Sequence, residues 1–170
     1  ALETNNSYAT SSLYVYGGTY RKSADSHKDA VVAAVQSVGS GIYLYEDVVI
    51  EATGSKAVRI CAPSHKNAWL GVYGATINGD IELLGPSVGK TATAEFFDCK
   101  VAGTVNVAEG TVVNLQGSPV IQAVALAEDT YLNLNKLTAG TSVGIVNGGV
   151  FTAPMKNPKD YVSYFYSADG

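Results

Sequence analysis

Apolar and polar residues alternate along most of this chain, and the alternation returns at a regular interval. The stretch 108–115 recurs nineteen residues later as 127–134, with five identical residues in eight positions. The same offset joins two columns of apolar residues: Val105, Val124 and Val143, and Val107, Leu126 and Ile145. A period near twenty, with short strands and glycine at the corners, predicts a solenoid. Each coil of a solenoid rises by about 4.8 Å and buries its inward residues against its neighbours.

The repeat extends toward the N-terminus at a slightly longer spacing. The stretch 73–83 matches 97–107 at an offset of twenty-four, and this match adds Ile81 and Leu83 to the two columns. We therefore predict a parallel sheet with two inward stacks: Ile81, Val105, Val124 and Val143 in one, and Leu83, Val107, Leu126 and Ile145 in the other.

Earlier segments carry the same two-residue alternation. It predicts strands at 13–16, 19–21, 42–45, 48–50, 57–60 and 70–73. In the third of these, Ile42 and Leu44 point inward and Tyr43 and Tyr45 point outward. Proline and polar residues at 62–68 and 85–90 indicate loops that leave the solenoid. The aromatic run 161–166 predicts a last strand that closes the C-terminal end or pairs with a following domain.

One segment has helical spacing instead. Ser26 is a suitable N-cap, Ala30, Val31, Ala34, Val35 and Val38 share one helical face, and Gly39 ends the pattern. We predict a helix at 27–38 that caps the first coil, whose strand edges would otherwise meet water. The expected domain is single: a cap at 1–39, coils at 40–152 and a closing segment at 153–170.

Composition narrows the function classes. Charged residues make up 15% of the 170 residues and the net charge is −4. This composition predicts no basic surface that would bind nucleic acid or an anionic membrane. No apolar run is long enough for membrane insertion, and no signal segment is visible. We therefore expect either a cytosolic protein or a chain that begins after a removed segment, and the abrupt ending favours a piece of a larger protein. Cys99 is expected to face inward and Cys61 outward, which favours two unpaired thiols and leaves a disulfide open.

Several motifs resemble a known group of proteins. They are Ala30 to Ala34, Gly41 to Leu44, Gly117 to Ile121, Asn133 to Ile145, Phe151, and Asp160 with Tyr161. From Ala30 onward the chain resembles the right-handed parallel β-helix segments of large secreted or wall-attached surface proteins of gut Gram-positive bacteria. The resemblance implies an all-β, right-handed parallel β-helix and a location outside the cell. Members of the group are usually regarded as adhesins or glycan-associated modules, and the resemblance supplies no functional residue.

Polysaccharide-degrading enzymes also use β-helices, so a lyase or glycosidase is the alternative. Glycosidases need two carboxylates on one cleft. Of the outward acids Glu82, Glu95, Asp98, Glu109 and Glu128, the last two stack on successive coils, but at a corner where solvated acids are common. The motifs of polygalacturonases are absent. His27 and His65 have no metal-ligand partners at a suitable spacing, and residues 85–91 lack the spacing of a phosphate loop, so we expect no metal and no cofactor.

The aromatic residues give the better candidate surface. The alternation turns Tyr14, Tyr16, Tyr43 and Tyr45 outward near one end, and Trp69 lies beside the loop of His65. Flat sugar faces stack on such rings, although tyrosine is also an ordinary strand residue. The sequence thus favours a non-catalytic spacer or adhesin at the cell surface. Its expected partners are a carbohydrate or host surface glycoprotein and the flanking domains of the same protein.

Overall fold

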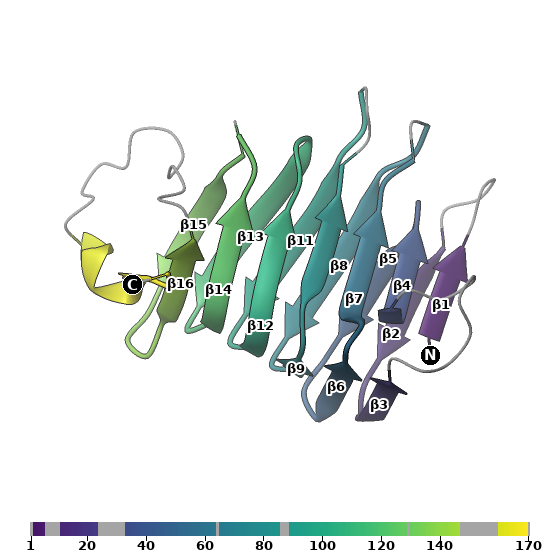
Figure 1. Cartoon of the computed structure of the whole chain (residues 1–170), viewed down its shortest axis with the longest axis horizontal. Helices are drawn as coiled ribbons and strands as arrows, with labels where there is room; N and C mark the ends of the chain where they lie inside the picture. The colour runs from purple at the N-terminus through teal and green to yellow at the C-terminus, as the bar shows by residue number, and fades with distance from the viewer. Residues whose placement is uncertain are drawn as a thin grey trace.

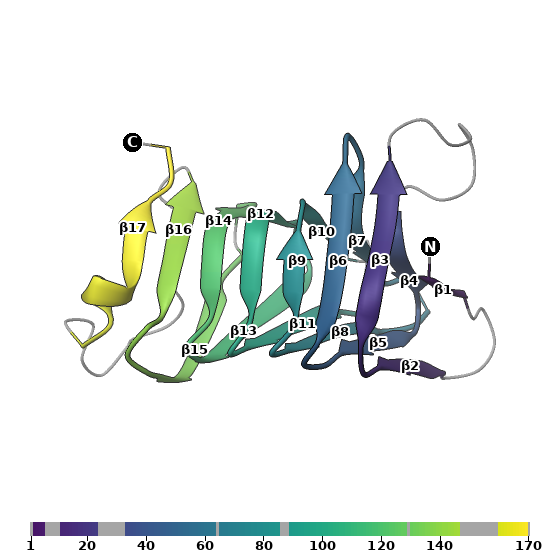
Figure 2. The same cartoon turned by 90° about the horizontal axis from the view of Figure 1, so that it is seen from below.

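Parallel strands wind into a β-solenoid of about five turns (Figure 1). The structure is a computed structural model that describes residues 2–5, 11–23, 33–63, 65–85, 89–128, 130–146 and 160–169. Figure 2 shows the strands stacked side by side along the long axis, with the N- and C-termini toward opposite ends of the stack. Every pairing between these strands is parallel, as the repeat predicts.

One side of the solenoid is a six-stranded sheet. In spatial order it contains β15 (Leu132–Leu137), β13 (Thr111–Gly117), β11 (Ala92–Phe97), β8 (Ala68–Tyr73), β5 (Gly41–Leu44) and β2 (Ser12–Val15). These strands alternate between buried and outward residues. Ile42 and Leu44 are fully buried, whereas Tyr43 and Tyr45 are partly exposed, which confirms their predicted directions.

The remaining sides form an eleven-stranded sheet. Its main path runs through β1 (Leu2–Asn5), β4 (Ala33–Val38), β7 (Lys56–Cys61), β10 (Ile81–Leu84), β12 (Lys100–Val107), β14 (Val120–Leu126), β16 (Ser142–Val146) and β17 (Phe165–Ser167). A branch contains β3 (Gly18–Ser23), β6 (Val48–Thr53) and β9 (Thr76–Asn78). The branch joins the path at β12, because the start of β12 pairs with β9 and its end pairs with β10.

The predicted stacks are correct up to β14 and wrong beyond it. Ile81, Val105 and Val124 pair in sequence, and so do Leu83, Val107 and Leu126. Val143, however, pairs with Ile121, and it is Ile145 that pairs with Val124. The nineteen-residue spacing fails here because the next coil is longer. Its six-stranded side contains an irregularity at Lys136, whose φ is 51°, so that Gly117 pairs with Leu137 although Gln116 pairs with Asn135.

The predicted helix at 27–38 is wrong where the structure describes it. Residues 33–38 form β4, which pairs with β1 and β7, and residues 27–32 lie outside the described residues. Alanine and valine at these positions fit both periods. Pairing with two neighbouring strands decides between them, since Val35 stacks on Val58 with no exposed surface.

The predicted C-terminal strand at 161–166 is only partly correct. Val162–Tyr164 form a 3-10 helix, and the strand β17 begins at Phe165 and pairs with β16. The two cysteines are free thiols: Cys99 is buried, as expected, and Cys61 is partly buried. No helix among the described residues is long and apolar enough to cross a membrane.

Candidate functional site

The outward face of the six-stranded sheet brings together all five aromatic residues singled out in the sequence. Tyr14 of β2 pairs directly with Tyr43 of β5, and Trp69 of β8 lies in the next column, paired with Gly41. Tyr16 and Tyr45 follow the ends of their strands and continue the outward alternation. Tyr14 is 52% exposed and Tyr16 is 70% exposed. We call the outward surface of β2, β5 and β8, with Tyr16 and Tyr45, the tyrosine face.

The rings on this face are stacked along the solenoid axis. Tyr14 and Tyr43 have centroids 5.0 Å apart, and Tyr16 and Tyr45 have centroids 4.7 Å apart. Tyr73 extends the second row, at 5.5 Å from Tyr45. These separations are those of offset-stacked aromatic pairs, which favour a common orientation of the rings.

Two glycines allow the rings to lie close to the sheet. A Cβ atom at Gly41 would meet the Tyr43 ring at 2.8 Å. At Gly71 it would meet the rings of Tyr73 at 2.4 Å and of Tyr43 at 2.7 Å. The Gly-x-Tyr pattern thus places each ring over the glycine two residues before it, where any side chain would lift it away from the sheet.

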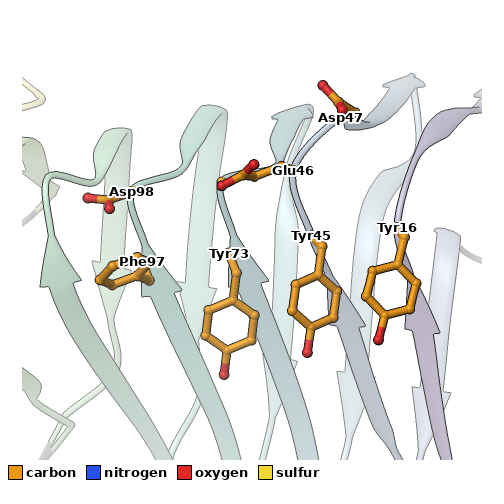
Figure 3. Close-up of a pocket in the computed structure, with 8 residues that line it drawn as sticks. Tyr16, Tyr45, Glu46, Asp47, Tyr73, Phe97 and Asp98 are labelled. Carbon is orange, nitrogen blue, oxygen red and sulfur yellow. The ribbon is translucent and has the colours of Figure 1, made fainter.

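An open groove runs along the edge of the tyrosine face. It has a volume of about 390 Å³ and is lined by Tyr16, Tyr45, Glu46, Asp47, Tyr73, Gly74, Phe97 and Asp98. Figure 3 shows the rings of Tyr16, Tyr45 and Tyr73 side by side with their hydroxyl groups pointing the same way, and Phe97 next in the row. The three acids lie along the other border of the row, at the corner where the chain leaves the six-stranded sheet.

At this corner, residues adopt left-handed backbone conformations with positive φ angles. Asp47 and Asp98 have φ values of 65° and 48°, a conformation that aspartate tolerates better than most residues. Oδ1 of Asp98 accepts hydrogen bonds from the backbone N–H of Ser118 at 2.7 Å and from its hydroxyl at 3.0 Å. Glu46 packs over Gly74, where an added Cβ would meet its Cγ at 2.6 Å. These contacts hold Glu46 and Asp98 beside the row of rings.

Glu95 lies below the same rings, on the outward face of β11. The Tyr73 hydroxyl donates a hydrogen bond to Oε2 of Glu95 at 2.6 Å. Partial burial, followed by this hydrogen bond and the charge of Glu95, raises the pKa of Tyr73 above its ordinary value. Burial also raises the pKa of Tyr43, with smaller contributions from Tyr14 and Glu95. Both hydroxyl groups therefore remain protonated donors at neutral pH.

Beyond β11 the same face carries amides in place of rings. The side chain of Asn133 donates to that of Asn114 at 3.1 Å, and Asn135 donates to Gln116 at 3.5 Å. These residues continue the columns of Tyr43 and Tyr73, respectively. The face thus changes along the axis from aromatic to polar, and both parts suit contacts with a hydroxyl-rich ligand.

Sequence reasoning missed part of the groove. It did not select Tyr73 and Phe97 as site residues, although their stretches align at the twenty-four-residue offset and their strands pair directly. It also did not place Glu46, Asp47 and Asp98 beside the rings. Tyr16, Tyr45 and Tyr73 recur at spacings of 29 and 28 residues, and only the strand pairing shows that each spacing is one coil, longer than the period near twenty predicted from the sequence.

The acids considered for catalysis are spread over the molecule. Glu82 lies on the eleven-stranded sheet and pairs with Arg59 at 2.8 Å, and Glu95 is bonded to Tyr73. Glu109 and Glu128 are exposed, each in the connection that leads back to the six-stranded sheet, whereas Asp98 follows the opposite end of a strand of that sheet. His65 is exposed, and His27 lies outside the described residues. Within the described part of the chain, no three His, Cys, Asp or Glu residues are grouped to hold a metal.

No family model, curated protein or solved structure matches this chain.

Proposed function

We propose that this chain is a non-catalytic, extracellular binding module that holds a carbohydrate on its tyrosine face. The observation that carries the proposal is the row of Tyr16, Tyr45 and Tyr73, stacked at 4.7 and 5.5 Å on successive coils and open to a groove. The outward edges of these stacked rings form a rigid surface against which the apolar faces of sugars can pack, and the hydroxyl groups add hydrogen bonds.

A linear polysaccharide fits this arrangement better than a compact ligand. The rings recur once per coil, so a chain lying along the solenoid axis meets a new aromatic residue at each step. The amide side chains of Gln116 and Asn135 continue that path on the same face. Affinity should therefore rise with the length of the oligosaccharide until the row is covered.

The location and the partner that we propose come from the resemblance of the sequence to bacterial surface proteins. We propose a right-handed coil, since parallel crossover connections strongly prefer that hand, and a place in a secreted or surface-attached protein as an adhesin or spacer. A host glycan or surface glycoprotein is the proposed partner.

The test is a glycan array followed by titration calorimetry with the oligosaccharides that bind. Tyr45→Ala removes the middle ring of the row and should weaken binding by about tenfold or more. Tyr131→Ala is the matched control, because Tyr131 is 42% exposed but lies before β15, outside the groove. Binding that is unaffected by Tyr45→Ala would refute the proposed surface.

The same samples test the enzymatic alternative. Each polymer is incubated with the protein, and new reducing ends or unsaturated products are measured. Turnover that Glu109→Gln or Glu128→Gln abolishes would replace the binding module by a β-helix lyase or glycosidase.

A further inference from the structure

The charges around the groove define the class of sugar that fits it. Glu46, Asp47 and Asp98 all line the groove, and none of them forms an ion pair with any residue that the structure describes. The strands β2, β5, β8, β11 and β13 contain no lysine or arginine, and their one charged residue is Glu95. The groove is thus an aromatic surface with uncompensated negative charge.

Such a surface distinguishes between classes of polysaccharide. Uronic acids and sulfated sugars would bring negative charge against the three carboxylates, which is unfavourable. A neutral sugar would gain only packing against the ring edges and hydrogen bonds. A protonated amino group gains more, because it is also attracted by the carboxylates.

The geometry suits an amine carried on a sugar ring. The acids lie along one border of the row of rings, so a sugar that lies across the outward edges of Tyr45 and Tyr73 presents its ring substituents to them (Figure 3). Asp98 is held there by its two hydrogen bonds from Ser118, and the Cγ of Glu46 lies over Gly74. A pre-positioned carboxylate, such as that of Asp98, loses little side-chain entropy when it binds a cation.

We propose that the ligand of the tyrosine face is a cationic polysaccharide, a polymer of glucosamine with free amino groups. The inference rests on the proposed function and names the substrate class of the same site. The sugar rings lie across the outward edges of Tyr16, Tyr45 and Tyr73, whose faces are stacked on one another, and the ammonium groups lie against Glu46, Asp47 and Asp98. The net charge of −4 on the whole chain favours the same ligand over an anionic one.

The experiment compares two ligands that differ in charge and little else. Hexamers of glucosamine and of N-acetylglucosamine are titrated into the protein at low and at moderate salt. We expect the glucosamine hexamer to bind about tenfold or more tightly, with an affinity that falls as salt rises, and the neutral hexamer to show little salt dependence.

Variants separate the role of the charges from that of the rings. The double change Glu46→Gln and Asp98→Asn should remove most of the preference for glucosamine while the neutral hexamer binds as before. Glu128→Gln is the control, since it removes an exposed acid outside the groove. Tyr45→Ala should weaken both hexamers.

The possible failures are distinguishable. If neither hexamer nor any other glycan binds, the proposed function itself is wrong. If the neutral hexamer binds as tightly as the cationic one, the tyrosine face binds carbohydrate but the inferred class is wrong. An oligolysine of equal charge that binds as tightly, and keeps its affinity in Tyr45→Ala, would show a simple acidic patch and would overturn the inference.

Discussion

The hydroxyl of Tyr73 and the carboxylate of Glu95 are joined by a 2.6 Å hydrogen bond that crosses from β8 to β11. The bond fixes the ring of Tyr73 over Gly71, at the end of the stack that begins with Tyr16. Glu95 itself does not line the groove, whose carboxylates are the three acids at the corner. The contact therefore positions the aromatic surface from outside the groove.

The pKa of Tyr73 leads to a prediction for alkaline pH. The pKa in the folded protein is raised above the ordinary value of a tyrosine, so the unfolded chain loses this proton first as pH rises. The contribution to stability is complete below the unfolded pKa and is lost as pH increases through the folded one. Melting temperatures measured between about pH 9 and pH 12 should fall, with tyrosinate absorbance as the parallel readout.

The control for that experiment is Glu95→Gln. Glutamine keeps a hydrogen-bond acceptor for the Tyr73 hydroxyl but removes the negative charge that opposes ionisation. The variant should ionise one tyrosine at lower pH than the original protein. An unchanged spectroscopic titration would show that Glu95 does not control Tyr73.

Gly71→Ala tests the packing of the rings against the sheet. Gly71 has no positive φ, so the backbone accepts alanine, but the new Cβ would lie 2.4 Å from the Tyr73 ring and 2.7 Å from the Tyr43 ring. Both rings must move outward. We expect a loss of about 1 kcal/mol in the free energy of unfolding and a weaker Tyr73–Glu95 hydrogen bond.

The matched change is Gly17→Ala, at another glycine without a positive φ. Its Cβ would meet only the Cβ of Asp47, at 3.9 Å, which is an ordinary contact. Urea denaturation and glycan titration should distinguish the two variants. Equal behaviour would mean that the rings adapt to the added methyl group at no cost.

Val124→Asp tests the solenoid core. Val124 has no exposed surface and stacks between Val105 and Ile145. An aspartate would place a charge in a dry column, and we expect a loss of at least about 3 kcal/mol in the free energy of unfolding. Val120→Asp on the same strand should change stability by less than about 0.5 kcal/mol, because Val120 is 39% exposed and pairs with Lys100. Circular dichroism during urea denaturation measures both.

The repeat predicted the architecture because stacking needs the same kind of residue at the same place in each coil. The stacking of Val105 on Val124 is visible in the sequence as two identical residues at the repeat spacing. The outward direction of Tyr43 and Tyr45 is visible as the alternation of apolar and polar positions. Exact register was not predictable in this way. The offset between paired residues rises from nineteen at Gln116 and Asn135 to twenty at Gly117 and Leu137. It is twenty-two at Ile121 and Val143 and twenty-one at Val124 and Ile145. These added residues leave no mark on the apolar pattern before them.

In the first coil, the local pattern of residues did not distinguish a strand from a helix. Ala34, Val35 and Val38 form a helical stripe as readily as an alternating strand, and only their neighbours in space decide. Val58 and Leu2 on either side of Val35 make the strand, and neither is near it in sequence. The sequence did not predict that the acids of the groove lie together, because their proximity also depends on neighbours in space. Glu46 and Asp98 are fifty-two residues apart, and the corner that joins them depends on coils of unequal length.

The two thiols should differ strongly in reactivity. Cys99 is 1% exposed, and its pKa is raised to about 12, chiefly by burial and further by the charge of Asp98. The thiolate is the reactive form, so Cys99 should react with an aromatic disulfide reagent at least about tenfold more slowly than the partly buried Cys61. Cys61→Ser and Cys99→Ala assign each kinetic phase, and denaturant should make the two rates equal. Fast modification of Cys99 in the folded protein, or an oxidised form that links it to Cys61, would show that this corner of the solenoid opens.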